Sequence, residues 1–168
     1  MMAMRKFFLL SLALLGVLTV HAGDGDQYLN VNGGFLFNST LNASVGYERE
    51  LSYSDALELF GEVGDRWHRD PKRDGIYSDM FKKDYYWGGG VLYKRNLKRY
   101  KNATLRLRFG PECGAHTGDY FFALEGGFEL NYVFPCRVQL SVIQKNQVGF
   151  FHGDTFRNGL LIGIKSPF

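Results

Sequence analysis

The sequence has little of what a helical membrane protein or a charge-driven nucleic-acid binder needs. After the apolar stretch from Phe7 to Val20, no segment approaches the roughly twenty apolar residues of a membrane-spanning helix. The formal net charge is only +3 at pH 7, so charge gives no support for direct nucleic-acid binding. The mean hydropathy of −0.20 does not argue against a membrane barrel, because such a barrel hides its apolar residues by alternation.

Catalytic and cofactor motifs are also missing. The sequence holds no HExxH, no CxxC pair and no P-loop, and Gly88–Gly90 lies inside a predicted strand rather than before a helix. We therefore expect no enzymatic activity, no catalytic residues, no cofactor, no metal and no small-molecule substrate. Some reactive residue types do gather at one predicted rim, where polar side chains are usually only solvated: His68, Asp70, Asp74, Ser78, His116 and His152.

The N-terminus predicts export. Arg5 and Lys6 precede the apolar stretch, and the residues up to Ala22 suit cleavage by a signal peptidase. We predict a signal peptide at residues 1–22 and one mature domain at residues 23–168. Removal of Arg5 and Lys6 leaves 18 basic against 17 acidic residues, so the mature domain is nearly neutral.

The stretch from Tyr120 to Phe134 indicates the fold class. Its apolar residues share one parity and its polar residues and glycine share the other: Phe122, Leu124, Phe128, Leu130, Tyr132 and Phe134 against Glu125, Gly127, Glu129 and Asn131. A period of two is that of a β-strand. About fifteen residues is long for a strand in a soluble protein, whereas a tilted strand that crosses a bilayer needs about nine to eleven and often has aromatic residues near its ends.

The same alternation recurs along the chain. It predicts strands at residues 28–37, 41–50, 56–67, 85–94, 103–116, 120–134, 137–145 and 155–168. Residues 68–84 are predicted to form a long loop and residues 96–102 a basic turn. The expected fold is all-β, an eight-stranded antiparallel up-and-down transmembrane β-barrel. Its outer face would contact outer-membrane lipid, and its termini would lie in the periplasm.

The inward parity carries charges of both signs. The predicted lumen charge network comprises Glu48, Glu58, Glu62, Glu112, Glu125 and Glu129 with Arg66, Lys94, Arg106, Arg108, Arg137, Lys145, Arg157 and Lys165. Buried charges are costly unless they are paired, and the interior of a barrel of about eight strands is just filled by its own side chains. The sequence therefore predicts a plugged barrel rather than a pore.

The two cysteines, Cys113 and Cys136, are expected to be free thiols. The predicted strands place them roughly 25–30 Å apart at about 3.3 Å per residue. A disulfide requires Cα atoms within about 7 Å of each other.

The second half of the sequence resembles the TraO family of conjugal transfer proteins of Bacteroidetes conjugative elements. The features that carry the resemblance lie between Asp84 and Lys165, in the same order as in the family: a Gly-rich strand, a basic turn, the LRLRFG strand, Gly126-Gly127 with Glu129, and a terminal Gly-Ile-Lys. The first half matches only loosely. The resemblance implies an outer-membrane component of a DNA-transfer apparatus, and it implies no catalytic residues.

These observations together suggest a role without catalysis. Because a filled barrel cannot pass DNA, we expect an accessory, anchor or scaffold that contacts other proteins of the conjugation apparatus. The best candidate for that contact is the basic segment before Asn102, with Lys94, Arg95, Lys98, Arg99 and Lys101. The alternative is a stand-alone surface barrel for adhesion or envelope integrity.

Overall fold

The computed structural model describes residues 25–51, 54–69, 76–77, 84–150 and 156–168. The signal peptide predicted at residues 1–22 and most of the loop predicted at residues 68–84 lie outside these ranges. Within the described part of the chain, no helix has the length and apolar character needed to cross a membrane.

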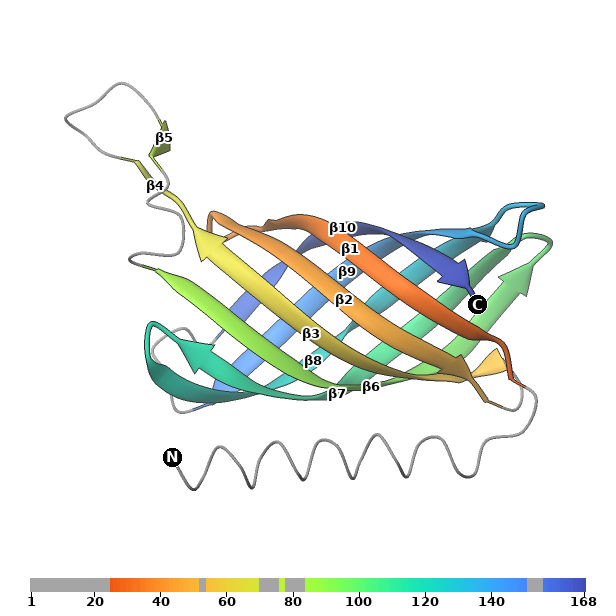
Figure 1. Cartoon of the computed structure of the whole chain (residues 1–168), viewed down its shortest axis with the longest axis horizontal. Coiled ribbons are helices and arrows are strands. Elements are labelled where there is room, and N and C mark those ends of the chain that lie inside the picture. Colours follow the sequence, from red (N-terminus) through yellow and green to blue (C-terminus); the bar gives the residue numbers. More distant parts are fainter. Residues whose placement is uncertain (1–24, 52–53, 70–75, 78–83, 151–155) are drawn as a thin grey trace.

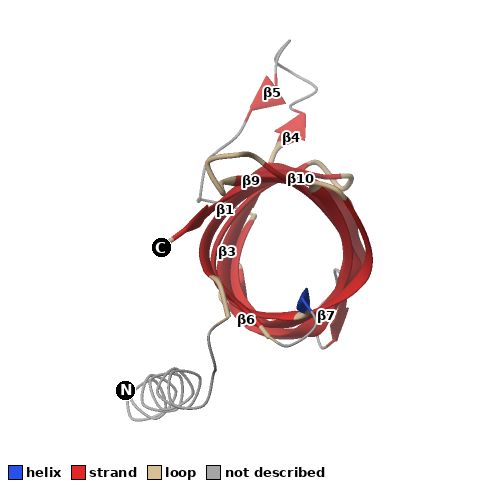
Figure 2. Cartoon of the chain, turned by 90° about the vertical axis from the view of Figure 1, so that its right-hand side faces the viewer, coloured by secondary structure: helices blue, strands red, loops and turns tan. Residues whose placement is uncertain are grey.

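Eight long strands close into a barrel, which confirms the fold class predicted from the sequence (Figure 1). Viewed from one end, the strands form a continuous ring (Figure 2). Every neighbouring pair is antiparallel, and the order around the ring is β1-β10-β9-β8-β7-β6-β3-β2. The barrel strands are β1 (Gln27–Leu36), β2 (Thr40–Glu50), β3 (Ala56–Arg66), β6 (Tyr85–Tyr100), β7 (Ala103–His116), β8 (Asp119–Val133), β9 (Gln139–Phe150) and β10 (Phe156–Pro167).

Two further strands, β4 (His68–Arg69) and β5 (Ile76–Tyr77), pair with each other between β3 and β6. They fall in the region predicted to be an irregular loop. The chain therefore leaves the barrel at this connection as a short antiparallel ladder (Figure 1).

The outer face of the barrel is an apolar belt. We define the outer belt as the exposed large apolar side chains of the strands, which include Leu29, Val31, Phe35, Val45, Val63, Trp87, Phe109, Phe122, Leu124, Phe128, Leu130, Val142, Val148, Leu160, Ile162 and Ile164. A soluble monomer rarely exposes an apolar patch of more than a few hundred Å². A belt of this kind around all eight strands matches the lipid-facing surface of a transmembrane barrel.

Aromatic pairs lie near both ends of the belt. At the end where β1 begins and β10 ends, the ring centroids of Tyr93 and Phe109 are 5.5 Å apart, and those of Tyr132 and Phe134 are 5.2 Å apart. We call this the hairpin end, because the β6–β7 hairpin extends from it (Figure 1). At the opposite end Phe122 and Phe150 are separated by 6.1 Å. Such girdles are typical of the two membrane interfaces of a barrel.

The largest difference from the predicted strands is in β6. This strand continues to Tyr100 and is 16 residues long, whereas the prediction ended it at Lys94 and placed residues 96–102 in a basic turn. The turn contains only Lys101 and Asn102. The charge of this segment is typical of a turn, but its backbone pairs with β7. Charged side chains are compatible with a strand once the strand has left the lipid.

The turn between β8 and β9 also differs from the prediction. The amide of Arg137 donates to the carbonyl of Phe134 at 2.9 Å, and the amide of Phe134 donates to the carbonyl of Val138 at 2.9 Å. These bonds keep Arg137 in the turn, with a φ of 66°. Its guanidinium pairs at 2.9 Å with Asp26 on the exposed surface. The assignment of Arg137 to the lumen network was therefore wrong.

The cysteines are free, as predicted. Cys113 is exposed on β7 and Cys136 is exposed in the turn between β8 and β9. Because Cys136 lies at the hairpin end and Cys113 pairs with Phe122 toward the opposite end, no change of rotamer could bring the two sulfurs together.

Candidate functional site: the charged lumen of the barrel

Among the described residues, the lumen holds equal numbers of buried glutamates and buried lysines or arginines. The glutamates are Glu48, Glu58, Glu62, Glu112, Glu125 and Glu129, and the basic residues are Lys94, Lys145, Lys165, Arg106, Arg108 and Arg157. All of them have the inward parity of their strands. Because an unpaired buried charge is costly, their arrangement determines what the lumen can do.

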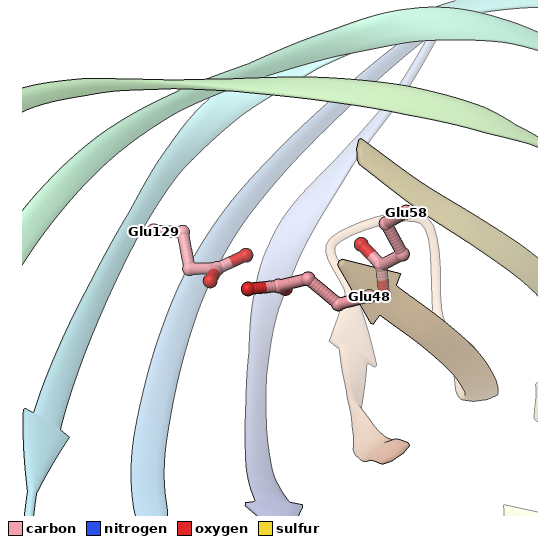
Figure 3. Close-up of side chains that lie close together, drawn as sticks. All are labelled: Glu48, Glu58 and Glu129. Atoms are coloured by element: carbon pink, nitrogen blue, oxygen red, sulfur yellow. The ribbon is translucent and has the colours of Figure 1, made fainter. Parts of the chain in front are cut away.

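The first charge cluster is built around Glu48, Glu58 and Glu129, which converge from β2, β3 and β8 (Figure 3). The Nζ atom of Lys94 lies 2.5 Å from Glu48 Oε2, 2.8 Å from Glu58 Oε2 and 2.7 Å from Glu129 Oε2. Lys165 Nζ lies 2.7 Å from Glu48 Oε2 and also pairs with Glu129. Two ammonium groups therefore offset part of the negative charge of these three carboxylates.

Arginine and asparagine side chains complete the first charge cluster. Arg106 Nη1 lies 2.6 Å from Glu48 Oε1, and the same guanidinium pairs with Glu50. Asn30 donates to Glu58 at 2.8 Å, and Asn131 donates to Glu129 at 2.8 Å. The carboxylates thus accept hydrogen bonds from neutral groups as well as from cations. Such bonds are what a buried ion pair requires to offset its loss of hydration.

The second charge cluster contains Glu62, Glu112 and Glu125. Lys145 pairs closely with Glu62, and its Nζ lies 3.1 Å from Glu125 Oε2 but 4.0 Å from Glu112 Oε2. The amide of Gln147 donates to Glu112 Oε2 at 2.6 Å. Arg108 joins the two clusters, since its guanidinium lies 2.8 Å from Glu125 and 3.4 Å from Glu129.

Neither cluster fits a bound metal ion. Each brings three carboxylates to within 4.8 Å of one another, which is a spacing that could hold a cation. In both clusters, however, a lysine ammonium pairs with these same carboxylates. A metal would have to displace a buried ammonium group. The expectation that the protein uses no cofactor remains a prediction.

Aromatic side chains fill the lumen beyond the second charge cluster. Tyr86 and Phe121 point inward, and their ring centroids are 6.2 Å apart. The guanidinium carbon of Arg157 lies 4.2 Å from the centroid of Tyr86 and 5.3 Å from that of Phe121. Asn42 donates to the hydroxyl of Tyr86 at 2.6 Å. Charged layers and this aromatic layer together fill the interior, as expected for a barrel of about eight strands.

Two further site predictions need correction. Lys94, which the sequence offered both as a lumen residue and as an exposed partner contact, is fully buried, so it is not available to a partner. Arg66 lies at the end of β3 near the rim, where it pairs with Asp84 at 3.3 Å rather than joining the central clusters. Arg95, Lys98, Arg99 and Lys101 are exposed at the hairpin end.

Sequence reasoning did not identify Gln147, Tyr86 or Phe121 as lumen residues. Gln147 was missed because the predicted strand ended at Lys145, whereas β9 extends to Phe150. A signal for Tyr86 was present, because it shares the parity of Gly88, Gly90 and Lys94. A signal for Phe121 was also present, because it shares the parity of Glu125, Gly127 and Glu129.

No family model and no curated protein matches the chain. Among solved structures, the chain is similar to a major outer membrane protein from Thermus thermophilus, with a TM-score of 0.63 and 8% identity over 87% of this chain and 100% of that chain. It is also similar to the de novo designed protein TMB2.3, with a TM-score of 0.52 and 13% identity over 86% of this chain and 94% of that chain. These similarities show the fold, which is that of an outer-membrane-type β-barrel.

Proposed function

We propose that this protein is a non-enzymatic outer-membrane barrel that serves as an accessory, anchor or scaffold of a conjugative DNA-transfer apparatus. The link to conjugation rests on the resemblance of residues 84–168 to the TraO family of Bacteroidetes conjugal transfer proteins. The filled lumen supports an accessory role within that apparatus. Charged side chains lie at its centre, and Tyr86 and Phe121 lie beyond them. A strand of DNA has no path through such an interior.

Because the lumen offers no conduit, the proposed contacts with partners lie on the outside of the barrel. Partners that do not thread through the lumen must contact the outer wall or the turns at either end. The exposed basic residues of the β6–β7 hairpin, Arg95, Lys98, Arg99 and Lys101, remain the best candidate for contact with the apparatus. A cluster of one charge sign can steer an oppositely charged partner to its site.

The proposed orientation places the hairpin end in the periplasm. The connection from β3 to β6 covers residues 67–84 at the opposite end of the barrel, whereas the β6–β7 turn contains only Lys101 and Asn102. Outer-membrane barrels have short periplasmic turns and longer extracellular loops. In this orientation the basic hairpin lies on the side from which a transfer apparatus would approach.

A deletion strain tests the proposal. The gene is removed from a conjugative donor, the strain is complemented with the wild-type gene, and transfer frequency is scored after heat-modifiable migration has shown that the barrel assembles. We expect deletion to lower transfer and complementation to restore it. Unchanged transfer after deletion would contradict the proposal and favour the stand-alone surface barrel.

A further inference from the structure

The β6–β7 hairpin extends beyond the rest of the barrel wall. On one side β6 pairs with β3 only as far as Lys94, which lies opposite Ala56. On its other side β6 pairs with β7 as far as Tyr100, which lies opposite Ala103. Within residues 25–51 and 54–69, no strand flanks the other side of Arg95–Tyr100. We call this unpaired side of the backbone the β6 edge.

Asp55 marks the start of the β6 edge. Its carboxylate accepts a hydrogen bond from the Tyr93 hydroxyl and another from the amide of Asn96 at 2.8 Å. The amide of Asn96 therefore points away from β7. A side chain, rather than a strand, satisfies this first edge amide, so the ladder on this side stops at Asp55.

The hairpin turn determines which way the backbone N–H and C=O groups near the end of β6 point. Tyr100 and Ala103 flank a turn of two residues, and such flanking residues exchange hydrogen bonds with each other. The N–H and C=O of Tyr100 therefore point toward β7. Because successive residues of a strand direct these groups to opposite sides, the N–H and C=O of Arg99 point away from β7. No backbone partner of these groups is present in the described part of the chain. Arg99 thus presents an open donor and acceptor to an incoming strand.

A β-bulge places basic side chains on both faces of the hairpin. The pairing runs from Asn96 opposite Arg106 to Lys98 opposite Leu105, so Leu97 is an extra residue. Bulges re-aim the side chains that follow them. Lys98 therefore shares the outer face with Leu105, while Arg99 lies opposite the buried Thr104 on the inner face.

Most of the positive charge of the hairpin has no acidic partner within the described residues, although the Asp55 carboxylate lies near enough to Arg95 for their charges to interact. Arg95, Lys98, Arg99 and Lys101 are exposed, and none of them forms an ion pair in the described part of the chain. No acidic residue occurs between Asp84 and Glu112 in the sequence. An extended segment with acidic side chains would complement this charge along its whole length.

We propose that the β6 edge binds an extended, acidic segment of a partner protein as an added β-strand. In strand addition, main-chain hydrogen bonds supply affinity and side chains select the partner. Basic edge residues disfavour pairing with another basic or apolar strand, and they favour an acidic one through complementary charge. Strand addition is a mode of contact for the proposed function, and only the identity of the partner rests on that function.

Two observations favour a protein segment over an anionic lipid surface. A tilted strand needs about nine to eleven residues to cross a bilayer, so several residues of the 16-residue β6 extend past the aromatic pair of Tyr93 and Phe109. A flat lipid surface would also meet only one face of the hairpin, whereas Lys98 and Arg99 lie on opposite faces.

Matched variants separate the backbone from the charge. Arg99→Pro removes the open amide together with the charge, and Arg99→Gln removes the charge alone. A third variant with Arg95, Lys98 and Lys101 changed to Gln keeps every edge amide. Each is purified as the full chain in detergent, and heat-modifiable migration shows that the barrel is folded.

The probe is a short fluorescent peptide in which glutamate alternates with threonine and valine, and binding is measured by anisotropy. We expect Arg99→Pro to weaken binding at least about fivefold, which is the effect of a lost hydrogen bond, and Arg99→Gln to weaken it about twofold. The triple Gln variant should weaken it about tenfold, because three ion pairs are removed. Added salt should weaken binding to the wild type.

The wild-type protein alone provides a second test that does not depend on a proline variant. Methylation of alternate backbone nitrogens of the peptide should abolish binding, and a peptide with lysine in place of glutamate should not bind. Equal binding of the methylated and unmethylated peptides would overturn strand addition. Failure of the acidic peptide to bind, with binding instead to vesicles that contain anionic phospholipid, would overturn it in favour of a lipid contact.

Peptide binding and DNA transfer can fail separately. Loss of peptide binding in Arg99→Pro with unchanged transfer in the deletion strain would keep strand addition and reject the conjugation role. Reduced transfer in the deletion strain, with no peptide binding to the wild type, would keep the conjugation role and reject strand addition.

Discussion

The outer belt and the lumen are built from the same strands but depend on different interactions. In β8, Leu124 and Phe128 are exposed on the outside, whereas Glu125 and Glu129 are buried on the inside. The outside needs only apolar side chains, since lipid contact does not require a specific partner. The inside needs particular partners at hydrogen-bond distance, such as Lys94 within 2.8 Å of three carboxylates.

This difference indicates which substitutions the barrel tolerates. One apolar residue of the belt can replace another with little effect, because lipid adapts to the new shape. A lumen residue cannot be replaced singly, because its partner then becomes an unpaired buried charge. The strands alone therefore close the barrel, and the side chains in the lumen determine that it is plugged.

The largest expected effect follows from removing a lumen cation. Lys94→Met leaves Glu48, Glu58 and Glu129 with too little positive charge, and we expect the free energy of unfolding to fall by about 3–5 kcal/mol. Urea unfolding in lipid vesicles measures it. The control is Lys98→Met, the same change on the exposed hairpin, which should stay within about 0.5 kcal/mol of wild type. Equal effects at both positions would remove the distinction between the lumen and the surface.

Placing a charge in the outer belt should have the next largest effect. Leu124 is 48% exposed near the middle of β8, and Leu97 is 49% exposed on the hairpin beyond the belt. Leu124→Arg should destabilise the barrel in a bilayer by about 2–4 kcal/mol, because the guanidinium replaces an apolar group in hydrocarbon. Leu97→Arg should have almost no effect. If both arginines are tolerated equally, the belt does not contact lipid.

The smallest expected effect follows from changing Asp55, whose carboxylate accepts hydrogen bonds outside the membrane-spanning part of the barrel. Hydrogen bonds from the Tyr93 hydroxyl and from the Asn96 amide hold the pKa of Asp55 below its ordinary value of 3.8. A lowered pKa in the folded state stabilises the fold above the unfolded pKa, and this contribution is lost as the pH falls through the folded pKa. Asp55→Asn should therefore destabilise by less than about 1 kcal/mol at pH 7.

The pH dependence gives the control for Asp55. The difference in stability between wild type and Asp55→Asn should shrink below about pH 4, because the wild-type carboxylate then becomes protonated. A difference that stays constant from pH 7 to pH 3 would show that charge on Asp55 does not contribute.

Much of the fold was predictable because a period of two governs most of the length of the barrel strands. Leu124 and Glu125 belong to opposite faces by parity alone, and the structure places them so. The extent of β6 was not predictable in this way. Arg95, Lys98 and Arg99 have the composition of a turn, and only their pairing with β7 beyond the lipid makes them a strand.

The composition of the lumen was predictable in large part, but its partners were not. Parity placed Glu48 and Lys165 inside, yet these residues are 117 positions apart in the sequence. Their contact depends on how the strands stagger around the closed ring, and the alternation of a single strand does not contain this stagger. Arg137 was misplaced by a strand boundary, because turn hydrogen bonds to Phe134 decide where β9 can begin.

The central claim is that side chains seal the barrel, and electrical conductance across a planar bilayer tests it most directly. The purified full chain is added at neutral pH, and a larger porin in the same bilayer shows that inserted channels are detected. We expect the wild-type protein to insert without stepwise conductance, because the charged and aromatic layers fill the lumen. Stable single-channel steps from the wild-type protein would contradict a plugged barrel and, with it, the role proposed outside the lumen.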